Sequence, residues 1–227
     1  MTKSVKVKPM RLLTHALLFS AIVGVMCGCE STVRKTMYSA YEKVGIEKRD
    51  ILRRRVDSAR DDQKEASESF QDALETFQKM YKFDGGNLEH QYGKVKSSYE
   101  RSADDAAKVH KGIVSMEKVA GDLFDEWENE AKQMESKDLR EKSLELRSGT
   151  QKRYETVHAT LKKSEARMDP ILKKLNDQVL FLKHNLNAKA ISSLSGESAI
   201  MEKEIQRLMT EIKAAISEAD GFIKELK

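Results

Sequence analysis

The sequence predicts an all-α protein, an elongated antiparallel coiled coil or helical bundle of about four long segments. Charged residues make up 34% of the 227 residues and apolar residues 39%, against roughly 25% and 45–50% in ordinary globular domains. This proportion of apolar residues is too small for a thick core, but it is enough to line narrow seams between helices. The chain has only 2 Pro and 11 Gly, and its apolar residues recur at alternating steps of four and three, the heptad spacing. These observations exclude a β-sandwich, a barrel or a doubly wound α/β enzyme.

The first helical segment is expected at 33–82 and the second at 88–135. Positions 52, 56, 59, 63, 66, 70, 73, 77 and 80 follow the heptad steps, and Gln63 is the one polar residue among them. The paired glycines and the asparagine at 83–87 predict a turn, because glycine adopts positive φ after a helix and asparagine caps the next one. Two long helices joined by so short a turn must be antiparallel neighbours.

The third segment, 137–191, has a weaker apolar stripe, formed by Leu139, Leu146, Tyr154, Val157, Leu161 and Met168. Asp169 and Pro170 resemble a helix N-cap followed by proline, which predicts a kink or a restart at 169–170. A serine-rich break at 192–196 leads into the last segment, 196–226, where eight positions keep the heptad steps. Seams this regular could close within one chain or between chains, so homo-oligomers are expected as an alternative.

The first 28 residues read as an export signal. Four basic residues precede an apolar stretch at 12–26, a pattern typical of a secretory signal. The stretch is shorter than the roughly 20 residues that a membrane-spanning helix needs. Its end resembles a bacterial lipobox, with Gly28 before Cys29, so we expect 1–28 to be removed and Cys29 to carry the lipid. An ordinary cleaved signal beside a cysteine is the alternative.

Removal of this segment also removes the excess positive charge. The net charge of +4 lies wholly in 1–28, which leaves 37 basic and 37 acidic residues in the predicted mature domain, 29–227. The basic residues there alternate with acidic ones, whereas nucleic-acid binding needs a basic face. We therefore expect no nucleic-acid partner. One cysteine remains, which is too few for a disulfide or a thiolate metal site.

Several stretches of the chain resemble a family of uncharacterised bacterial proteins, known only as a domain of unknown function and found mainly in marine and other Gram-negative proteobacteria. The matching stretches are 37–45, 48–52, 55–61, 83–86, 123–128 and 178–191. The resemblance covers nearly the whole mature chain, and 178–191 is its most specific part. It implies helical architecture and often a lipobox, but it brings no catalytic residues.

The sequence offers no catalytic or cofactor-binding constellation. Gly93-Lys94-Val95 is the nearest approach to a phosphate-binding loop, but it lacks the hydroxyl residue and the first glycine of that motif. The histidines form no metal-binding pair, and the acidic run around Trp127 lacks the tight loop of a calcium site. We therefore predict no enzyme activity, no cofactor and no metal.

The best candidate site is a partner-docking surface. Its polar residues flank an apolar run at 179–182 that is more apolar than one seam needs; they are Lys183, His184, Asn185, Asn187 and Lys189. A helix packed on two sides would explain the same pattern.

The sequence therefore favours a non-enzymatic, lipid-anchored periplasmic spacer, scaffold or adaptor. We expect it in the cell envelope on the periplasmic face, where it would be held to the membrane through lipid on Cys29 and bind an envelope protein. Glu30 stands where an aspartate would retain a lipoprotein in the inner membrane, which favours the outer membrane. The alternatives are a cytoplasmic coiled-coil protein associated with DNA maintenance and, with least support, an enzyme.

Overall fold

The structure is a computed structural model that describes residues 36–39, 47–83 and 85–226. The chain divides into two units, Met1–Glu47 and Lys48–Lys227. In the first unit residues 36–39 are helical. The predicted signal and Cys29 lie outside the described residues.

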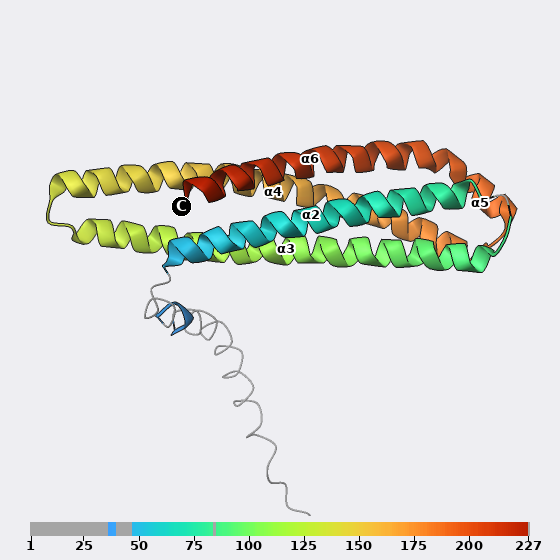
Figure 1. The fold of residues 1–227 in the computed structure, drawn as a ribbon, viewed down its shortest axis with the longest axis horizontal. Coiled ribbons are helices and arrows are strands. Elements are labelled where there is room, and N and C mark those ends of the chain that lie inside the picture. Colours follow the sequence, from blue (N-terminus) through green and yellow to red (C-terminus); the bar gives the residue numbers. More distant parts are fainter. Residues whose placement is uncertain (1–35, 40–46, 84, 227) are drawn as a thin grey trace, which may run out of the picture. The chain divides into compact units, whose positions relative to one another are not determined.

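The second unit confirms the predicted all-α class. Four long helices, labelled as in Figure 1, account for most of it: α2 (Lys48–Tyr81), α3 (Leu88–Gln133), α4 (Lys137–His184) and α6 (Ser198–Glu225). A short helix, α5 (Ala188–Leu194), and a 3₁₀ turn, η1 (Ser195–Glu197), connect α4 to α6. The described residues contain no strand.

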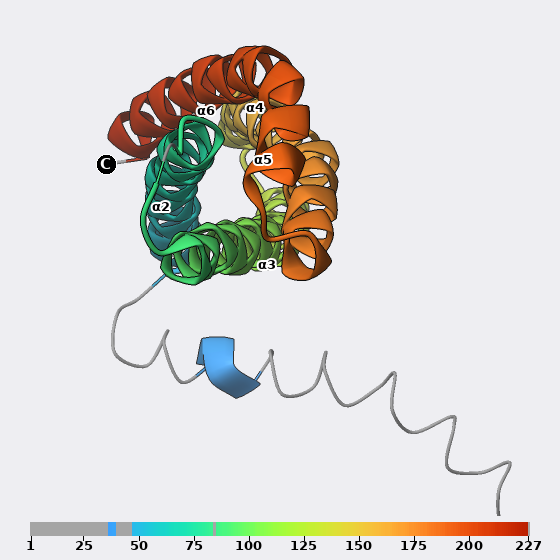
Figure 2. The same ribbon diagram turned by 90° about the vertical axis from the view of Figure 1, so that its right-hand side faces the viewer.

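The four long helices form a ring in which each packs on two neighbours. Helix α2 packs on α3 and α6, and α4 packs on the same two helices from the opposite side (Figure 2). Cross-helix ion pairs fix the antiparallel direction, because Glu65 pairs with Lys108 whereas the later Asp72 pairs with the earlier Arg101. The unit is therefore an antiparallel four-helix bundle with its core along the central axis.

The heptad positions of α2 and α6 face this core. All nine predicted positions of α2 and all eight of α6 and its C-cap are buried. Buried polar residues interrupt the seams at a few places. Ser102 of α3 donates to the backbone oxygen of Ser69 in α2 at 3.0 Å, whereas both amide atoms of Gln63 are buried without a hydrogen-bond partner.

The turn between α2 and α3 has the expected chemistry. Gly86 has a φ of 110°, which an L-residue rarely adopts. The Asn87 side chain then accepts a hydrogen bond from the backbone N–H of His90 at 2.9 Å and so caps α3.

The third segment differs from the sequence-based prediction in two ways. Helix α4 runs unbroken through Pro170, so no restart occurs there; the buried side chains of Met168 and Ile171 anchor both sides of the proline in the core. The helix ends at 185–187, before the predicted break at 192–196; Asn185 ends α4 and Asn187 begins α5. In the sequence, Asp169 and Pro170 predict a helix boundary more strongly than Asn185 and Asn187 do.

The prediction that Leu139 and Leu146 lie in a seam is wrong. Leu139 is 61% exposed and Leu146 is 65% exposed. The reason is length: α6 ends at Glu225, beside Arg153 of α4. The first four turns of α4 therefore have no α6 beside them.

Candidate functional site

Most ionisable side chains near the seams are occupied in pairs between helices. Arg60 of α2 pairs with Asp220 of α6 at 2.8 Å, and Lys174 of α4 pairs with Glu204 of α6 at 2.5 Å. The Asp220 hydrogen bond is the largest of the causes that raise the pKa of Arg60. Such pairs hold helices in register and leave few free groups for chemistry along the length of the bundle.

Two of the histidines belong to the same system of pairs. His110 lies 2.5 Å from Glu165 and His158 lies 2.6 Å from Glu117, each joining α3 to α4. Burial raises the pKa of Glu165, but hydrogen bonds from Lys162 and His110 outweigh it and leave that pKa below its ordinary value. These histidines therefore act as links between helices.

Two residues of the acidic run around Trp127 are also engaged in ion pairs. Glu126 pairs with Lys48 at the start of α2. Glu128 pairs with Lys132 and Arg147, and these two cations, Lys132 first, lower the pKa of Glu128. Across the described residues no group of three His, Cys, Asp or Glu side chains is placed to hold a metal ion.

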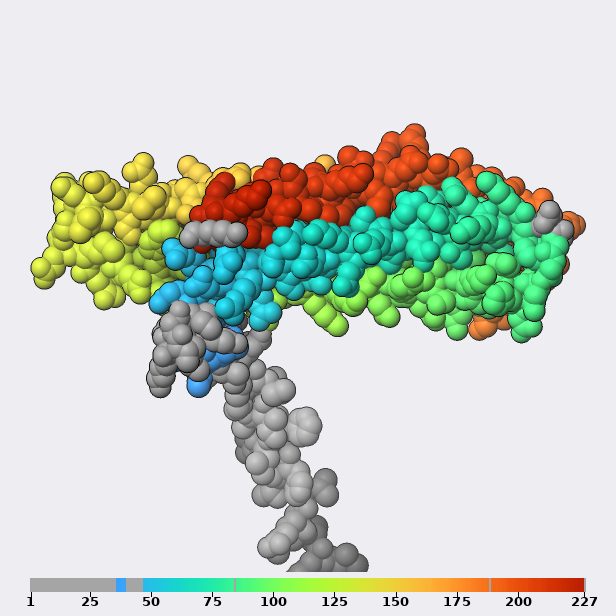
Figure 3. Space-filling model, in the orientation of Figure 1, coloured from blue at the N-terminus to red at the C-terminus, as the bar shows by residue number. Residues whose placement is uncertain are grey.

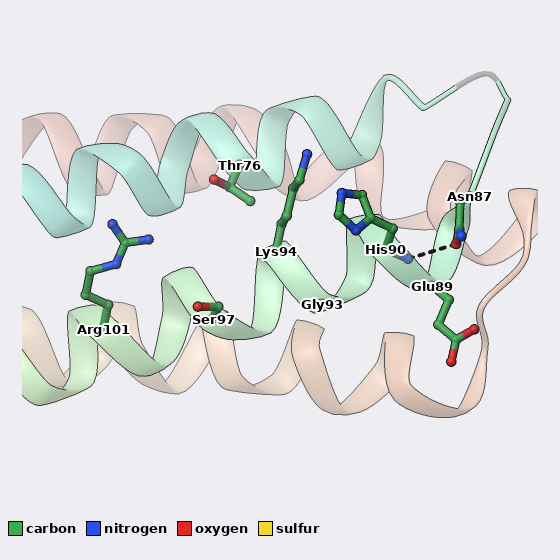
Figure 4. Close-up of a pocket in the computed structure, with 8 residues that line it drawn as sticks. All are labelled: Thr76, Asn87, Glu89, His90, Gly93, Lys94, Ser97 and Arg101. Atoms are coloured by element: carbon green, nitrogen blue, oxygen red, sulfur yellow. Dashed lines mark hydrogen bonds between the residues drawn. The ribbon is translucent and has the colours of Figure 1, made fainter.

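An open groove of about 640 Å³ lies between α2 and α3 near their connecting turn. Lys94 and Arg101 reach from α3 toward Thr76 of α2, and Gly93 leaves space between them and His90 (Figure 4). Arg101 is already paired with Asp72 at 2.9 Å. Because Gly93 and Lys94 lie inside α3, their backbone N–H groups cannot cradle a phosphate.

The predicted docking residues surround the corner between α4 and α5, and two of them build that corner. The Asn185 side chain donates to the backbone oxygen of Phe181 at 2.9 Å. The Asn187 side chain accepts from the backbone N–H of Ala190 at 3.0 Å. Both asparagines therefore shape the backbone, a role that helix-capping preference could have identified.

The other three predicted residues, Lys183, His184 and Lys189, are exposed. Between Asp177 and Glu197 the chain contains no acidic residue, unlike the alternating charges elsewhere. Exposed apolar side chains lie at the same end of the bundle, namely Leu180, Phe181 and Ile200. We call this group, with Lys183, His184 and Lys189, the α5-end surface.

The opposite end has a second exposed apolar group that sequence reasoning missed. It consists of Met134, Leu139 and Leu146. Leu139 and Leu146 lie seven residues apart, as seam residues do, so their spacing alone could not show that they are uncovered. The lengths of the helices were needed, and helix ends are poorly defined by sequence patterns.

The family profile described as "Protein of unknown function (DUF2959)" matches residues 37–226. The chain belongs to the DUF2959 family. The match confirms the resemblance to an uncharacterised family, and it extends over all of α2 to α6. No curated protein matches the chain.

For this DUF2959 domain, the part of the chain that the structure describes contains no helix long and apolar enough to cross a membrane. The family description assigns no activity to any residue.

Proposed function

We propose that the chain is a non-enzymatic, lipid-anchored envelope protein that acts as a scaffold or adaptor and binds through the ends of its bundle. One observation carries this proposal. The large apolar side chains that the described structure leaves exposed all lie near the two ends, at 134–146 and at 180–200. Ion pairs occupy the sides. Exposed apolar groups of this kind mark interaction surfaces.

The predicted leader supports attachment to a membrane on the periplasmic side. Lipid on Cys29 would be separated from the first residue of α2, Lys48, by 18 residues. Helix α2 then spans about 51 Å at 1.5 Å per residue over its 34 residues. A bundle of this length can hold two components of an envelope apart or together.

The α5-end surface is suited to an acidic segment of another envelope protein. Its exposed lysines, Lys183 and Lys189, have no acidic residue between Asp177 and Glu197 to neutralise them, and the exposed His184 lies between them in the sequence. Phe181 and Leu180 supply apolar contact beside them. Complementary charge speeds and orients encounter, while apolar contact supplies most of the binding energy.

Radiolabelled palmitate tests the anchor. We expect the wild-type chain to incorporate label and fractionate with membranes, and Cys29→Ser to do neither. Cys27→Ser is the matched control, because it removes the neighbouring thiol but keeps the lipidation site. Labelling and membrane fractionation of Cys29→Ser would overturn the anchor.

A reporter fusion separates this proposal from the cytoplasmic alternative. Alkaline phosphatase joined after residue 40 folds into an active enzyme only outside the cytoplasm, where its disulfides form. We expect an active fusion, and an inactive one when the four basic residues and the apolar stretch are deleted. An inactive fusion of the intact leader would favour a cytoplasmic role in DNA maintenance.

A further inference from the structure

Helices α3 and α4 extend beyond their neighbours at one end of the bundle. Helix α2 begins at Lys48, beside Glu126 of α3, and α6 ends at Glu225, beside Arg153 of α4. The hairpin formed by 127–152 therefore projects past both, as Figure 3 shows. We call it the α3–α4 tip.

The two open sides of the tip differ in chemistry. On α3, Arg101 and Lys108 face α2, and Glu126 does so as well. Asn129 lies three heptads after Lys108, and Gln133 lies one heptad after Glu126, so both residues continue the rows that face α2. Both are polar and exposed. The side from which α2 is missing is therefore built to face water.

The side from which α6 is missing is apolar. On α4, Arg167 and Arg153 lie two heptads apart and both pair with α6. The same row continues back through Leu146 and Leu139, which are the most exposed of the large apolar residues described. The row of α4 that borders α6 is therefore apolar over the two heptads that α6 does not reach.

The tip is a formed hairpin and not a frayed end. The Trp127 ring N–H donates to the Ser143 hydroxyl at 2.9 Å. The Arg147 guanidinium donates to the backbone oxygen of Phe124 at 2.9 Å and lies over the Phe124 ring. These contacts hold α3 against α4 and direct the leucine row away from α3, toward the missing position of α6.

We propose that a second copy of this chain covers the row, with its own α3–α4 tip placed antiparallel to the first. A two-fold axis would set Leu139 of each copy against Leu146 of the other, an isologous contact. In that register Lys137 of the second copy lies level with Ser148 of the first. The second tip then ends short of Arg153, where α6 ends, so it fits the space that α6 leaves.

Charge favours a second copy over a membrane surface or a strongly charged protein. Residues 127–152 contain six acidic and six basic side chains, interspersed. Such a surface has no net charge that would repel a copy of itself or attract anionic headgroups. Two leucines from each copy form a small contact, below the roughly 800 Å² per partner of a stable complex, so the dimer is weak and its bundles point in opposite directions.

Photo-crosslinking of the full chain in cells tests the contact. With p-benzoylphenylalanine at Leu146 we expect an adduct of twice the chain mass that contains only this chain. The matched control carries the probe at Gln133, which is exposed on the α2 side of the same tip, and should give no such adduct. The proposal is overturned by an absent adduct, by adducts with lipid or another protein alone, or by equal crosslinking at Gln133.

A charge exchange provides a second, independent test. Co-purification of two differently tagged copies should fall at least about tenfold for L139E/L146E with itself and for L139K/L146K with itself. Mixing the two variants should restore it. Because both leucines are exposed, thermal melts should stay unchanged. Failure of the mixture to recover co-purification, with both variants folded, would overturn the two-fold contact.

Discussion

The indole N–H of Trp127 donates to the hydroxyl of Ser143 at 2.9 Å, across a hairpin that extends beyond the described ends of α2 and α6. Trp127 is the one tryptophan of the chain. The bond joins α3 to α4 beyond the start of α2 and the end of α6, so the local stability of the tip depends on contacts within the hairpin.

Ser143→Ala should loosen this tip without affecting the bundle. Loss of one such hydrogen bond costs about 0.5–1.5 kcal/mol, which corresponds to faster amide exchange in 137–145 by roughly two- to tenfold. Hydrogen exchange measured by mass spectrometry reports it. Ser148→Ala, at an exposed position of the same helix, should leave exchange unchanged; equal acceleration by both variants would contradict the role of the Trp127–Ser143 bond.

Gln63→Leu should stabilise the bundle. Gln63 is 0% exposed, and both of its amide atoms lack hydrogen-bond partners. A buried unsatisfied polar group costs about 1–3 kcal/mol, so leucine of similar size should raise the free energy of unfolding by roughly 1 kcal/mol or more. Urea denaturation measures this. Gln71→Leu on the exposed face of α2 is the control, and no gain for Gln63→Leu relative to it would refute the prediction.

Two leucines of α4 should respond very differently to truncation. Leu161 is fully buried, whereas Leu146 is 65% exposed. Leu161→Ala should lower the free energy of unfolding by about 2–5 kcal/mol through lost burial and a cavity. Leu146→Ala should change it by no more than about 0.5 kcal/mol at low protein concentration. Thermal and chemical unfolding measure both. Similar costs for the two variants would mean that another helix covers α4 as far as Leu146 in the same chain.

The link between α3 and α4 at Glu165 should make stability depend on pH. The pKa of Glu165 is lowered in the folded state from its ordinary value of 4.5, because hydrogen bonds from Lys162 and His110 outweigh burial. A lowered carboxyl pKa adds stability above the unfolded value, and this stability is lost as pH falls through the folded value.

Glu165→Gln should therefore destabilise the protein at pH 7, and the difference should shrink as the pH falls below about 4.5. We expect about 0.5–1 kcal/mol, since solvent screens a pair that is partly exposed. Unfolding measured at pH 7 and pH 3.5 checks this. Glu141→Gln, an exposed i,i+4 partner of Lys137, is the control; a difference for Glu165→Gln that grows toward low pH would have the wrong sign.

The sequence predicts the helices better than their ends. Heptad spacing correctly identifies the buried faces of α2 and α6, because each has long neighbours along its whole length. It fails at Leu139 and Leu146, because a heptad row looks the same whether or not a second helix covers it. It also predicts a kink or a restart at Pro170, and α4 does not restart there but continues through the proline.

Of the two candidate surfaces, the sequence predicts one and misses the other. Charge and hydropathy along 178–189 predict a docking surface. The pattern could not separate Asn185 and Asn187, which cap helices, from the exposed Lys183 and Lys189. That distinction depends on backbone geometry. The α3–α4 tip was missed because it depends on the relative lengths of helices far apart in the sequence.

Photo-crosslinking at both ends and in the middle of the bundle tests most directly whether the protein acts by binding through its ends. Probes at Phe181 and at Leu146 should each yield discrete protein adducts in intact cells, and a probe at Ala214, exposed midway along α6, should yield none. The Phe181 adduct should diminish in K183E/K189E. Adducts at Ala214 as strong as those at the ends, or none at either end, would contradict the account.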